Sequence, residues 1–163
     1  MSAKSKMVKL TIFILATLLT AGFLAGPSQA SEVLNLSQGQ TVYVPLYSNI
    51  FVGDRQLNWA LSALLSIRNT DPSNPITVSV ADYYDTNGKL VRKYLSKPDQ
   101  LNPLGSTYYY VKTSDTTGGW GANFIVQWNS EKEVSEPIIQ SIMIGTRGTH
   151  SVSFITQGRI IAK

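Results

Sequence analysis

Several short segments of the chain alternate between apolar and other side chains with a period of two, and this pattern restricts the fold more than any other feature. Residues 42–46 place Val, Val and Leu at alternate positions, and residues 76–80 alternate in the same way. A period of two is typical of a β-strand that buries one face. Asn87-Gly88, just before an apolar run over residues 90–95, is a strong signal for a hairpin turn. The alternation predicts an antiparallel, all-β fold.

Five further segments complete the strand prediction. Two of them are ambiguous, because residues 61–67 are rich in the helix formers alanine and leucine and residues 138–144 form a nearly continuous apolar run. We interpret both as strands. The others cover residues 107–112, 123–128 and 151–161, the last interrupted at Gly158. Seven or eight short strands separated by turn residues predict an immunoglobulin-like antiparallel β-sandwich, with a small β-barrel as the alternative.

The chain contains no cysteine, so no disulfide bond can stabilise this fold. Residues 31–163 show no internal repeat, no low-complexity tract and no linker long enough to divide them. Their number suits one domain with its own hydrophobic core. We therefore predict a single β-sandwich domain over residues 31–163.

Residues 1–30 have the features of a secretory signal peptide. Three lysines precede an apolar run over residues 10–24, and Ser28 and Ala30 provide the small residues before a cleavage site. We expect cleavage after Ala30 and export to the periplasm or the medium. The alternative is an uncleaved N-terminal membrane anchor, although the run is shorter than the about 17 residues that a spanning helix needs. Lipid attachment at this site is excluded because it requires a cysteine.

Removing this leader removes most of the net charge. The whole chain has a formal charge of +4, and the leader holds three lysines and no acid, so residues 31–163 have a charge of about +1. Lys89, Arg92, Lys93 and Lys97 form one modest cluster beside acidic residues rather than the basic face that nucleic acids require. We expect no nucleic-acid partner.

The segment Asp85-Thr86-Asn87-Gly88 is similar to the start of a calcium-binding loop. The twelfth position of such a loop would be Ser96, however, where a bidentate carboxylate is needed. We interpret the segment as a hairpin turn. No other cluster has the spacing of a metal or cofactor motif, so we predict no metal and no cofactor.

The stretch from Ser114 to Phe124 combines hydroxyl groups, three glycines and a tryptophan. Its glycines would let main-chain amides approach an anion, but a strand follows instead of a helix N-terminus, so we favour a structured turn. Glycine neighbours offer Trp120 little local packing. If the domain binds a ligand, we predict that Ser114, Asp115, Trp120 and Asn123 contact it.

Catalytic chemistry has weak support in the sequence. His150 is the single histidine, and nothing in the sequence places it near Ser114 or Asp115. A hydrolase would have to use Asp115 or Asp82 with a hydroxyl nucleophile. Arg68 ends an apolar run, and we predict that its guanidinium forms a structural ion pair with an acid such as Asp82.

Aromatic residues are numerous for a chain of this size. Flat rings with a polar edge suit sugars or extended peptides, and they also pack well in sandwich cores. The run Tyr108-Tyr109-Tyr110 must alternate between the two faces of a strand. We expect most aromatic rings in the core or packed on a sheet, with one or two at the surface.

Six sequence blocks follow the leader in an order typical of a known family. They are Val42-Tyr-Val-Pro-Leu-Tyr-Ser48, Leu65-Ser-Ile-Arg-Asn-Thr-Asp71, Asp82-Tyr-Tyr-Asp85 with Gly88-Lys-Leu-Val-Arg92, Ser114-Asp-Thr with Gly118-Gly, Gly121-Ala-Asn-Phe124, and Met143-Ile-Gly-Thr146. In these blocks the chain resembles the uncharacterised bacterial family called domain of unknown function 3124. The resemblance implies an exported, single-domain bacterial protein, and it implies no activity, ligand or catalytic residue.

These observations favour a non-enzymatic, exported binding module for a peptide, an envelope protein or a glycan, an inference that rests partly on fold-level analogy. One alternative is an envelope hydrolase, and another is a structural or chaperone-like accessory protein whose sheet edge accepts a partner strand. Convergence of Ser114, Asp115, Asn123, Asp82 and His150 in one cleft would favour the hydrolase. A flat aromatic face would favour the binding module.

Overall fold

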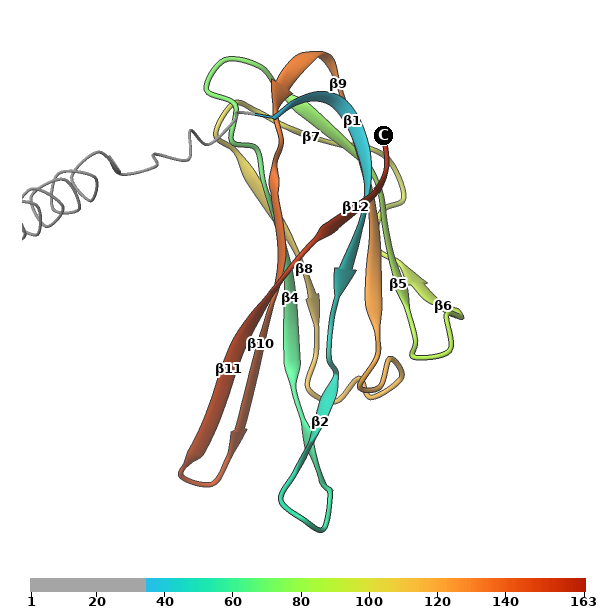
Figure 1. The fold of residues 1–163 in the computed structure, drawn as a ribbon, viewed down its shortest axis with the longest axis vertical. Helices are drawn as coiled ribbons and strands as arrows, with labels where there is room; N and C mark the ends of the chain where they lie inside the picture. Colours follow the sequence, from blue (N-terminus) through green and yellow to red (C-terminus); the bar gives the residue numbers. More distant parts are fainter. Residues whose placement is uncertain (1–34) are drawn as a thin grey trace, which may run out of the picture. The chain divides into compact units, whose positions relative to one another are not determined.

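Each segment predicted as a strand is extended in the computed structural model, which describes residues 35–163 (Figure 1). The predicted leader, its cleavage site and the alternative of an anchor lie outside the described residues. The strands are β1 (Leu36–Pro45), β2 (Asn49–Val52), β3 (Leu57–Ala60), β4 (Ser62–Arg68), β5 (Ile76–Tyr84), β6 (Leu90–Lys93), β7 (Asp99–Leu101), β8 (Ser106–Val111), β9 (Asn123–Ser135), β10 (Ile138–Arg147), β11 (His150–Gln157) and β12 (Arg159–Ala162).

The described residues contain twelve strands, where the sequence predicted seven or eight. The segment 151–161 is divided at Gly158 into β11 and β12, which accounts for one of the additional strands. The others are β2, β3 and β7, which have four, four and three residues. Segments this short show too few alternations for a period to be recognised. The two ambiguous segments, 61–67 and 138–144, are strands as predicted.

The larger sheet has six strands in the order β12-β1-β9-β5-β6, and β7 also pairs with β5. All of its pairs are antiparallel, with β-bulges between β1 and β12, β1 and β9, β5 and β6, and β5 and β9. Val44, Val78, Tyr83 and Val126 of this sheet point into the core and are fully buried. β9 continues past the predicted end at residue 128 as far as Ser135.

The smaller sheet has four strands in the order β11-β10-β4-β8. All of its pairs are antiparallel, and their register is continuous, without bulges. Leu65, Val111 and Met143 from this sheet are fully buried against the larger one. The two sheets form a β-sandwich as predicted, and they are not joined into the small barrel that was the alternative.

A short hairpin of β2 and β3 lies in the connection from β1 of the larger sheet to β4 of the smaller one. Beside this connection, the rings of Tyr47 and Phe154 meet edge to face with centroids 5.6 Å apart. This contact joins the segment after β1 to β11 and closes part of the gap between the sheets. The part of the chain that the structure describes has no helix able to cross a bilayer.

Candidate functional site

The loop between β8 and β9, residues 112–122, contains most of the predicted site residues, and we call it the glycine loop. It is held against the start of the β2 segment by Ser48, whose hydroxyl accepts a hydrogen bond from the Gly119 amide at 2.8 Å. The Ser48 amide in turn donates to the Gly119 carbonyl at 3.0 Å. Ser48 is fully buried, so this reciprocal pair is shielded from water.

Thr86, in the turn between β5 and β6, holds the other side of the glycine loop. Its amide and its hydroxyl both donate to the Gly118 carbonyl, each at 2.9 Å. The Thr86 hydroxyl also accepts the Gly121 amide at 3.1 Å. The amides of Gly119 and Gly121 therefore already have protein acceptors, which supports the structured turn over the anion site.

Gly118 is glycine because the core lies directly beneath it. A Cβ atom at this position would lie 1.9 Å from the hydroxyl oxygen of Tyr83 and 2.7 Å from the Cβ of Ala122. Burial, assisted by the negative charge of Asp115, raises the pKa of Tyr83 to about 12. The glycine loop is thus anchored on a buried, uncharged phenol rather than lying over an open cleft.

Asp115 uses both of its carboxylate oxygens within its surroundings. One oxygen accepts hydrogen bonds from the amide and hydroxyl of Thr117, at 3.2 and 2.5 Å. The other lies 3.3 Å from a terminal guanidinium nitrogen of Arg92. Together with Lys112 and Ser114, these residues line an open depression of about 360 Å³. The depression has a small excess of positive charge and no group positioned to activate the Ser114 hydroxyl.

The predicted ligand contacts have different surroundings. Trp120 is 57% exposed at the tip of the glycine loop. Asn123, in contrast, is buried at the start of β9, where it lies opposite Pro45 and Tyr84 of the neighbouring strands. Ser114 is exposed beside Asp115. Trp120 and Ser114 are accessible to a ligand, whereas the Asp115 side chain is mostly covered and Asn123 is part of the sheet.

The residues needed for a hydrolase are not gathered in one cleft. Asp82 and Tyr83 are successive residues of β5, so their side chains point to opposite faces of the sheet. Tyr83 points into the core under the glycine loop, which places Asp82 on the outer face of the larger sheet. His150 is exposed beside the hairpin turn, opposite Arg147 of β10. No group of three potential metal ligands occurs within residues 35–163.

The predicted ion pair between Arg68 and Asp82 does not form. β4 ends with Arg68 at the end of the sandwich where β5 begins, and Asp82 lies six residues farther along β5, about 20 Å away at the rise of a strand. Arg68 is exposed, and its Nε donates to the Ser66 hydroxyl at 3.4 Å.

A network of buried polar residues follows Arg68 instead. The Asn69 side chain donates to the carbonyls of Asn74 and Asn102 at 2.9 and 3.0 Å. One carboxylate oxygen of Asp71 accepts the amides of Ser73 and Asn74 at 2.9 and 2.8 Å, which lowers the pKa of this carboxyl below its usual value. Neither Asn69 nor Asp71 was predicted as a site residue, although Asn-X-Asp before Pro is a frequent turn signal.

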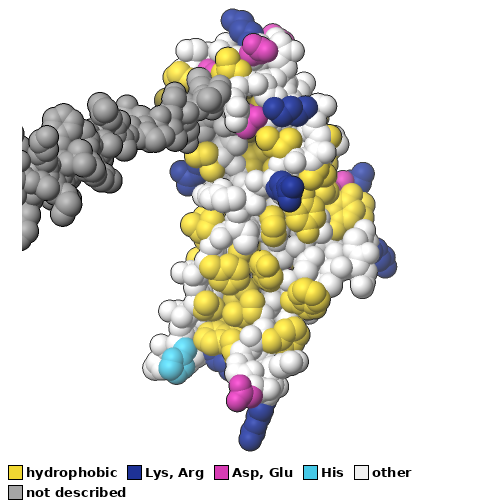
Figure 2. Space-filling model, in the orientation of Figure 1, with side chains coloured by type: hydrophobic (Ala, Val, Ile, Leu, Met, Phe, Trp, Pro, Cys, Tyr) yellow, Lys and Arg dark blue, Asp and Glu magenta, His cyan; other side chains and the backbone are white. Residues whose placement is uncertain are grey.

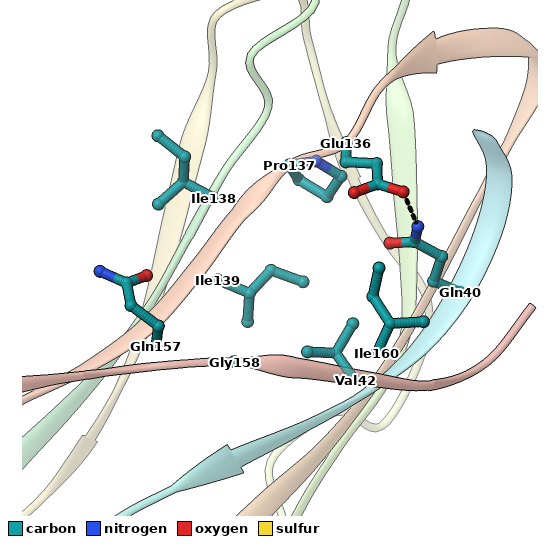
Figure 3. A pocket seen from close by; sticks show the side chains of 9 residues that line it. All are labelled: Gln40, Val42, Glu136, Pro137, Ile138, Ile139, Gln157, Gly158 and Ile160. Carbon is teal, nitrogen blue, oxygen red and sulfur yellow. Dashed lines mark hydrogen bonds between the residues drawn. The ribbon is translucent and has the colours of Figure 1, made fainter. Parts of the chain in front are cut away.

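A cavity of about 250 Å³ lies where β12 crosses from one sheet to the other (Figure 3). Val42, Ile139 and Ile160 form its apolar part. At its polar side, the Gln40 amide donates to the Glu136 carboxylate, which also lies 3.6 Å from the Lys163 ammonium group. The charge of Glu136 is thus already neutralised, and the cavity offers space for a small apolar group.

A row of apolar side chains crosses the outer face of the smaller sheet, and we call this row together with Tyr108 the tyrosine face. Cross-strand pairing places Tyr110, Leu64, Ile142 and Ile155 directly opposite one another in a single row across β8, β4, β10 and β11. Tyr110 and Ile155 at the ends of this row are 47% and 55% exposed. Tyr108, two residues from Tyr110 on the same face, is 65% exposed.

This face was not predicted from the sequence, although a signal for it was present. Residues 138–144 have apolar side chains at both odd and even positions, which we interpreted as a buried strand. The structure buries one side and leaves Ile138 and Ile144 46% and 49% exposed on the other. An apolar run in a sheet with one solvated face is a signal for such a surface.

A family model described as "Protein of unknown function (DUF3124)" matches residues 39–161 of the chain. No curated protein shows significant sequence similarity to it. Among solved structures, the crystal structure of Thermotoga maritima 1070 is similar, with a TM-score of 0.45 and 12% sequence identity, covering 74% of this chain and 92% of that chain.

Proposed function

We propose, from the premise that the chain belongs to the DUF3124 family of proteins of unknown function, that it is an exported, non-enzymatic binding module. Export is supported by the order of charge, apolar run and small residues in the first thirty positions. The binding surface is the tyrosine face. Its ligand is a chain-like component of the cell envelope, either an extended peptide segment of another protein or a glycan.

The observation that supports this function best is the row from Tyr110 to Ile155. Large contiguous apolar patches are rare on the surfaces of monomeric proteins, and where they occur they mark binding surfaces. Tyr108 and Tyr110 lie about 7 Å apart along their strand, so their rings can contact successive units of an extended ligand. Tyrosine suits this role because its ring is apolar and its hydroxyl can bond to polar groups.

Enzymatic function has no comparable support. The hydroxyl, carboxylate and imidazole groups that a hydrolase would combine lie on the glycine loop, on the outer face of the larger sheet and beside the β10–β11 turn. The amides of the glycine loop that would stabilise an anion are bonded to Ser48 and Thr86.

The test uses the exported protein, purified after expression of the full chain, with two probes measured separately: isolated cell-wall glycan and total envelope protein. We expect the double variant Tyr108→Ala/Tyr110→Ala to lose most of the binding to one of the two probes. Each exposed aromatic anchor at an interface typically contributes about 1–2 kcal/mol, so the combined loss is at least about tenfold.

Trp120→Ala is the matched control, because this ring has similar exposure but lies on the glycine loop. It also tests the sequence-based prediction that the glycine loop contacts the ligand. If Trp120→Ala abolished binding and the tyrosine variant retained it, the binding site would be the glycine loop and not the tyrosine face. If neither probe bound the wild-type protein, the binding function itself would be contradicted.

A further inference from the structure

The two sheets differ in how their edge strands are protected against pairing with other chains. β6, at one edge of the larger sheet, contains Arg92 and Lys93, and its pairing is interrupted by a bulge. β12, at the other edge, is four residues long, begins with Arg159 and also has a bulge. Charges, short length and bulges are the means by which proteins prevent edge-to-edge association. Both edges of the larger sheet are therefore protected.

β11, at one edge of the smaller sheet, has none of these features. It is eight residues long, contains no Lys, Arg, Asp, Glu or Pro, and pairs with β10 without a bulge. β8, at the opposite edge, is also uncharged, but it is shorter and is partly covered. There the Tyr94 hydroxyl donates to the Tyr110 carbonyl at 3.2 Å, and the Tyr94 ring lies against Tyr109. β11 is the longer, open edge.

The hydrogen bonds of β11 show which of its main-chain groups are free. The Gly158 amide donates to the Ile139 carbonyl at 2.8 Å, directly after β11 and in register with it. Hydrogen-bonded pairs alternate along an antiparallel ladder, so the even-numbered residues of β11 bond to β10. The N–H and C=O groups of Ser151, Ser153, Ile155 and Gln157 therefore point to the open edge.

Apolar side chains lie beside this edge. After Gly158 the chain leaves the smaller sheet, and β12 pairs with β1 only at residues 41–43. A Cβ atom at Gly158 would lie 2.7 Å from a Val42 methyl group, so the crossing is close. Three apolar side chains near this crossing are half-buried against the core: Tyr47, Val152 and Phe154. Figure 2 shows hydrophobic side chains gathered over this region, between the positions of β11 and β2 in Figure 1.

We propose that β11 pairs antiparallel with β11 of a second copy of this chain, about a two-fold axis near Phe154. The two four-stranded sheets become one eight-stranded sheet. The inward side chains of each β11 then cover the apolar region beside the edge of the other copy. This inference does not depend on the proposed ligand-binding function.

A second copy fits this edge for three reasons. β11 has no charge, so it can lie against itself without repulsion, whereas β6 would place Arg92 and Lys93 against the same residues. Antiparallel pairing of a strand with itself about a two-fold axis sets side chains of the same face opposite each other. The apolar row of the tyrosine face ends at Ile155, and pairing about Phe154 would bring the Ile155 side chains of the two copies together as diagonal neighbours across the axis.

The first test measures the mass of the exported, purified protein by sedimentation equilibrium over a concentration series. We expect a reversible dimer. Ser153→Pro removes an N–H group that points to the open edge and has no partner among residues 35–163, and Ile155→Lys places two like charges near the axis. Each should raise the dissociation constant of the dimer at least about tenfold.

Ile161→Lys is the matched control, because Ile161 is 56% exposed on the edge strand β12 while Ile155 is 55% exposed on β11. It should leave the dissociation constant within about twofold, a change of less than 0.5 kcal/mol. Thermal unfolding of each variant separates loss of the dimer from loss of the fold. A monomer at all concentrations, or a dimer that tolerates both β11 substitutions, would overturn the proposal.

The second test uses the absence of cysteine from the chain. In the double variant Ser153→Cys/Ile155→Cys, pairing about an axis at residue 153, 154 or 155 brings two cysteines of different copies opposite each other, within the distance a disulfide spans. Mild oxidation should give a covalent dimer. Tyr108→Cys/Tyr110→Cys, with the same spacing and face on β8, should not. Cross-linking of the β8 pair alone would assign the interface to the other edge and refute the proposal.

Discussion

The glycine loop and the tyrosine face differ in where their polar and apolar groups find partners. The glycine loop is rich in hydroxyls, amides and charge, and most of these groups bond to Ser48, Thr86, Thr117 or Arg92. The tyrosine face consists of ordinary strand residues, and its apolar groups are in contact with solvent. Residue types that suggest chemistry are therefore a poor guide to function here. Groups without an internal partner are a better one.

The substitution expected to destabilise the protein most is at Gly118, where the glycine loop makes its closest contact with the core. Gly118→Ala would place a methyl group onto the Tyr83 hydroxyl and the Ala122 side chain, so either the core or the loop must move. We expect a loss of about 3 kcal/mol in the free energy of unfolding, measured by chemical denaturation. Gly121→Ala is the control, because its new Cβ would meet only a side-chain methyl of Thr86 at 3.1 Å. Equal losses for the two variants would show that Gly118 is not a special contact.

A smaller loss of stability is expected when the buried Ser48 hydroxyl, which holds the glycine loop, is removed. Ser48→Ala removes a fully buried hydroxyl and leaves the half-buried Gly119 amide without its acceptor, which costs about 1–3 kcal/mol. The control is Ser62→Ala, because the Ser62 hydroxyl makes a single hydrogen bond near the surface, to the Ile144 carbonyl at 3.1 Å. Hydrogen exchange should show faster exchange of the Gly119 amide in the Ser48 variant. An unchanged rate would mean that water replaces the hydroxyl at no cost.

The strands and the sandwich could be predicted because their signal is local. A strand such as β5 is indicated by the alternation over residues 76–80, and Asn87-Gly88 marks its hairpin to β6. β7 was missed because three residues contain no period, and it forms only through its pairing with β5. The division at Gly158 was visible in the sequence as a possible interruption. Its cause, the close crossing over Val42, depends on long-range packing.

The candidate site could be predicted less well, because its properties depend on which groups meet across the fold. The exposure expected for Trp120 follows from its glycine neighbours and is observed. The Arg68 ion pair fails because charge and proximity in sequence do not determine which end of a strand an acid lies on. Asn69 and Asp71 fill buried positions through bonds to segments up to 64 residues away, such as the bond from the Ser135 amide to Asp71. No local pattern reveals that pairing.

The buried phenol of Tyr83 under the glycine loop should make the stability of the protein depend on pH. The pKa of Tyr83 is about 12 in the folded protein and about 10 when exposed, so below pH 10 both states keep the proton and stability does not depend on this group. Between pH 10 and 12 the unfolded chain ionises first, so stability falls as the pH rises. Tyr83→Phe should make this fall shallower, while burial of Tyr94 and Tyr109, which raises their pKa values, preserves part of it.

The same variant has an expected result at neutral pH. The Tyr83 hydroxyl is buried and makes no hydrogen bond among the described residues. Its removal should therefore change the free energy of unfolding by less than about 1 kcal/mol, or stabilise the protein slightly. A loss larger than this would reveal an acceptor for the hydroxyl in solution, with Ser48 as the nearest candidate, and would make the loop and the phenol one hydrogen-bonded unit.

Two exposed aromatic rings, one on each surface, should contribute little to stability. Trp120→Ala and Tyr108→Ala each remove a ring that is more than half exposed, one from the glycine loop and one from the tyrosine face. Neither ring fills a core cavity, so each substitution should change the free energy of unfolding by less than about 0.5 kcal/mol, against about 3–5 kcal/mol for a buried aromatic such as Phe124. Denaturation of the three variants side by side measures this directly. If Trp120→Ala were as costly as Phe124→Ala, the tryptophan would be packed in solution, and it could serve neither as a ligand contact nor as the control for the tyrosine face. If Tyr108→Ala alone were costly, the face would be a covered surface, as it would be where a partner already occupies it.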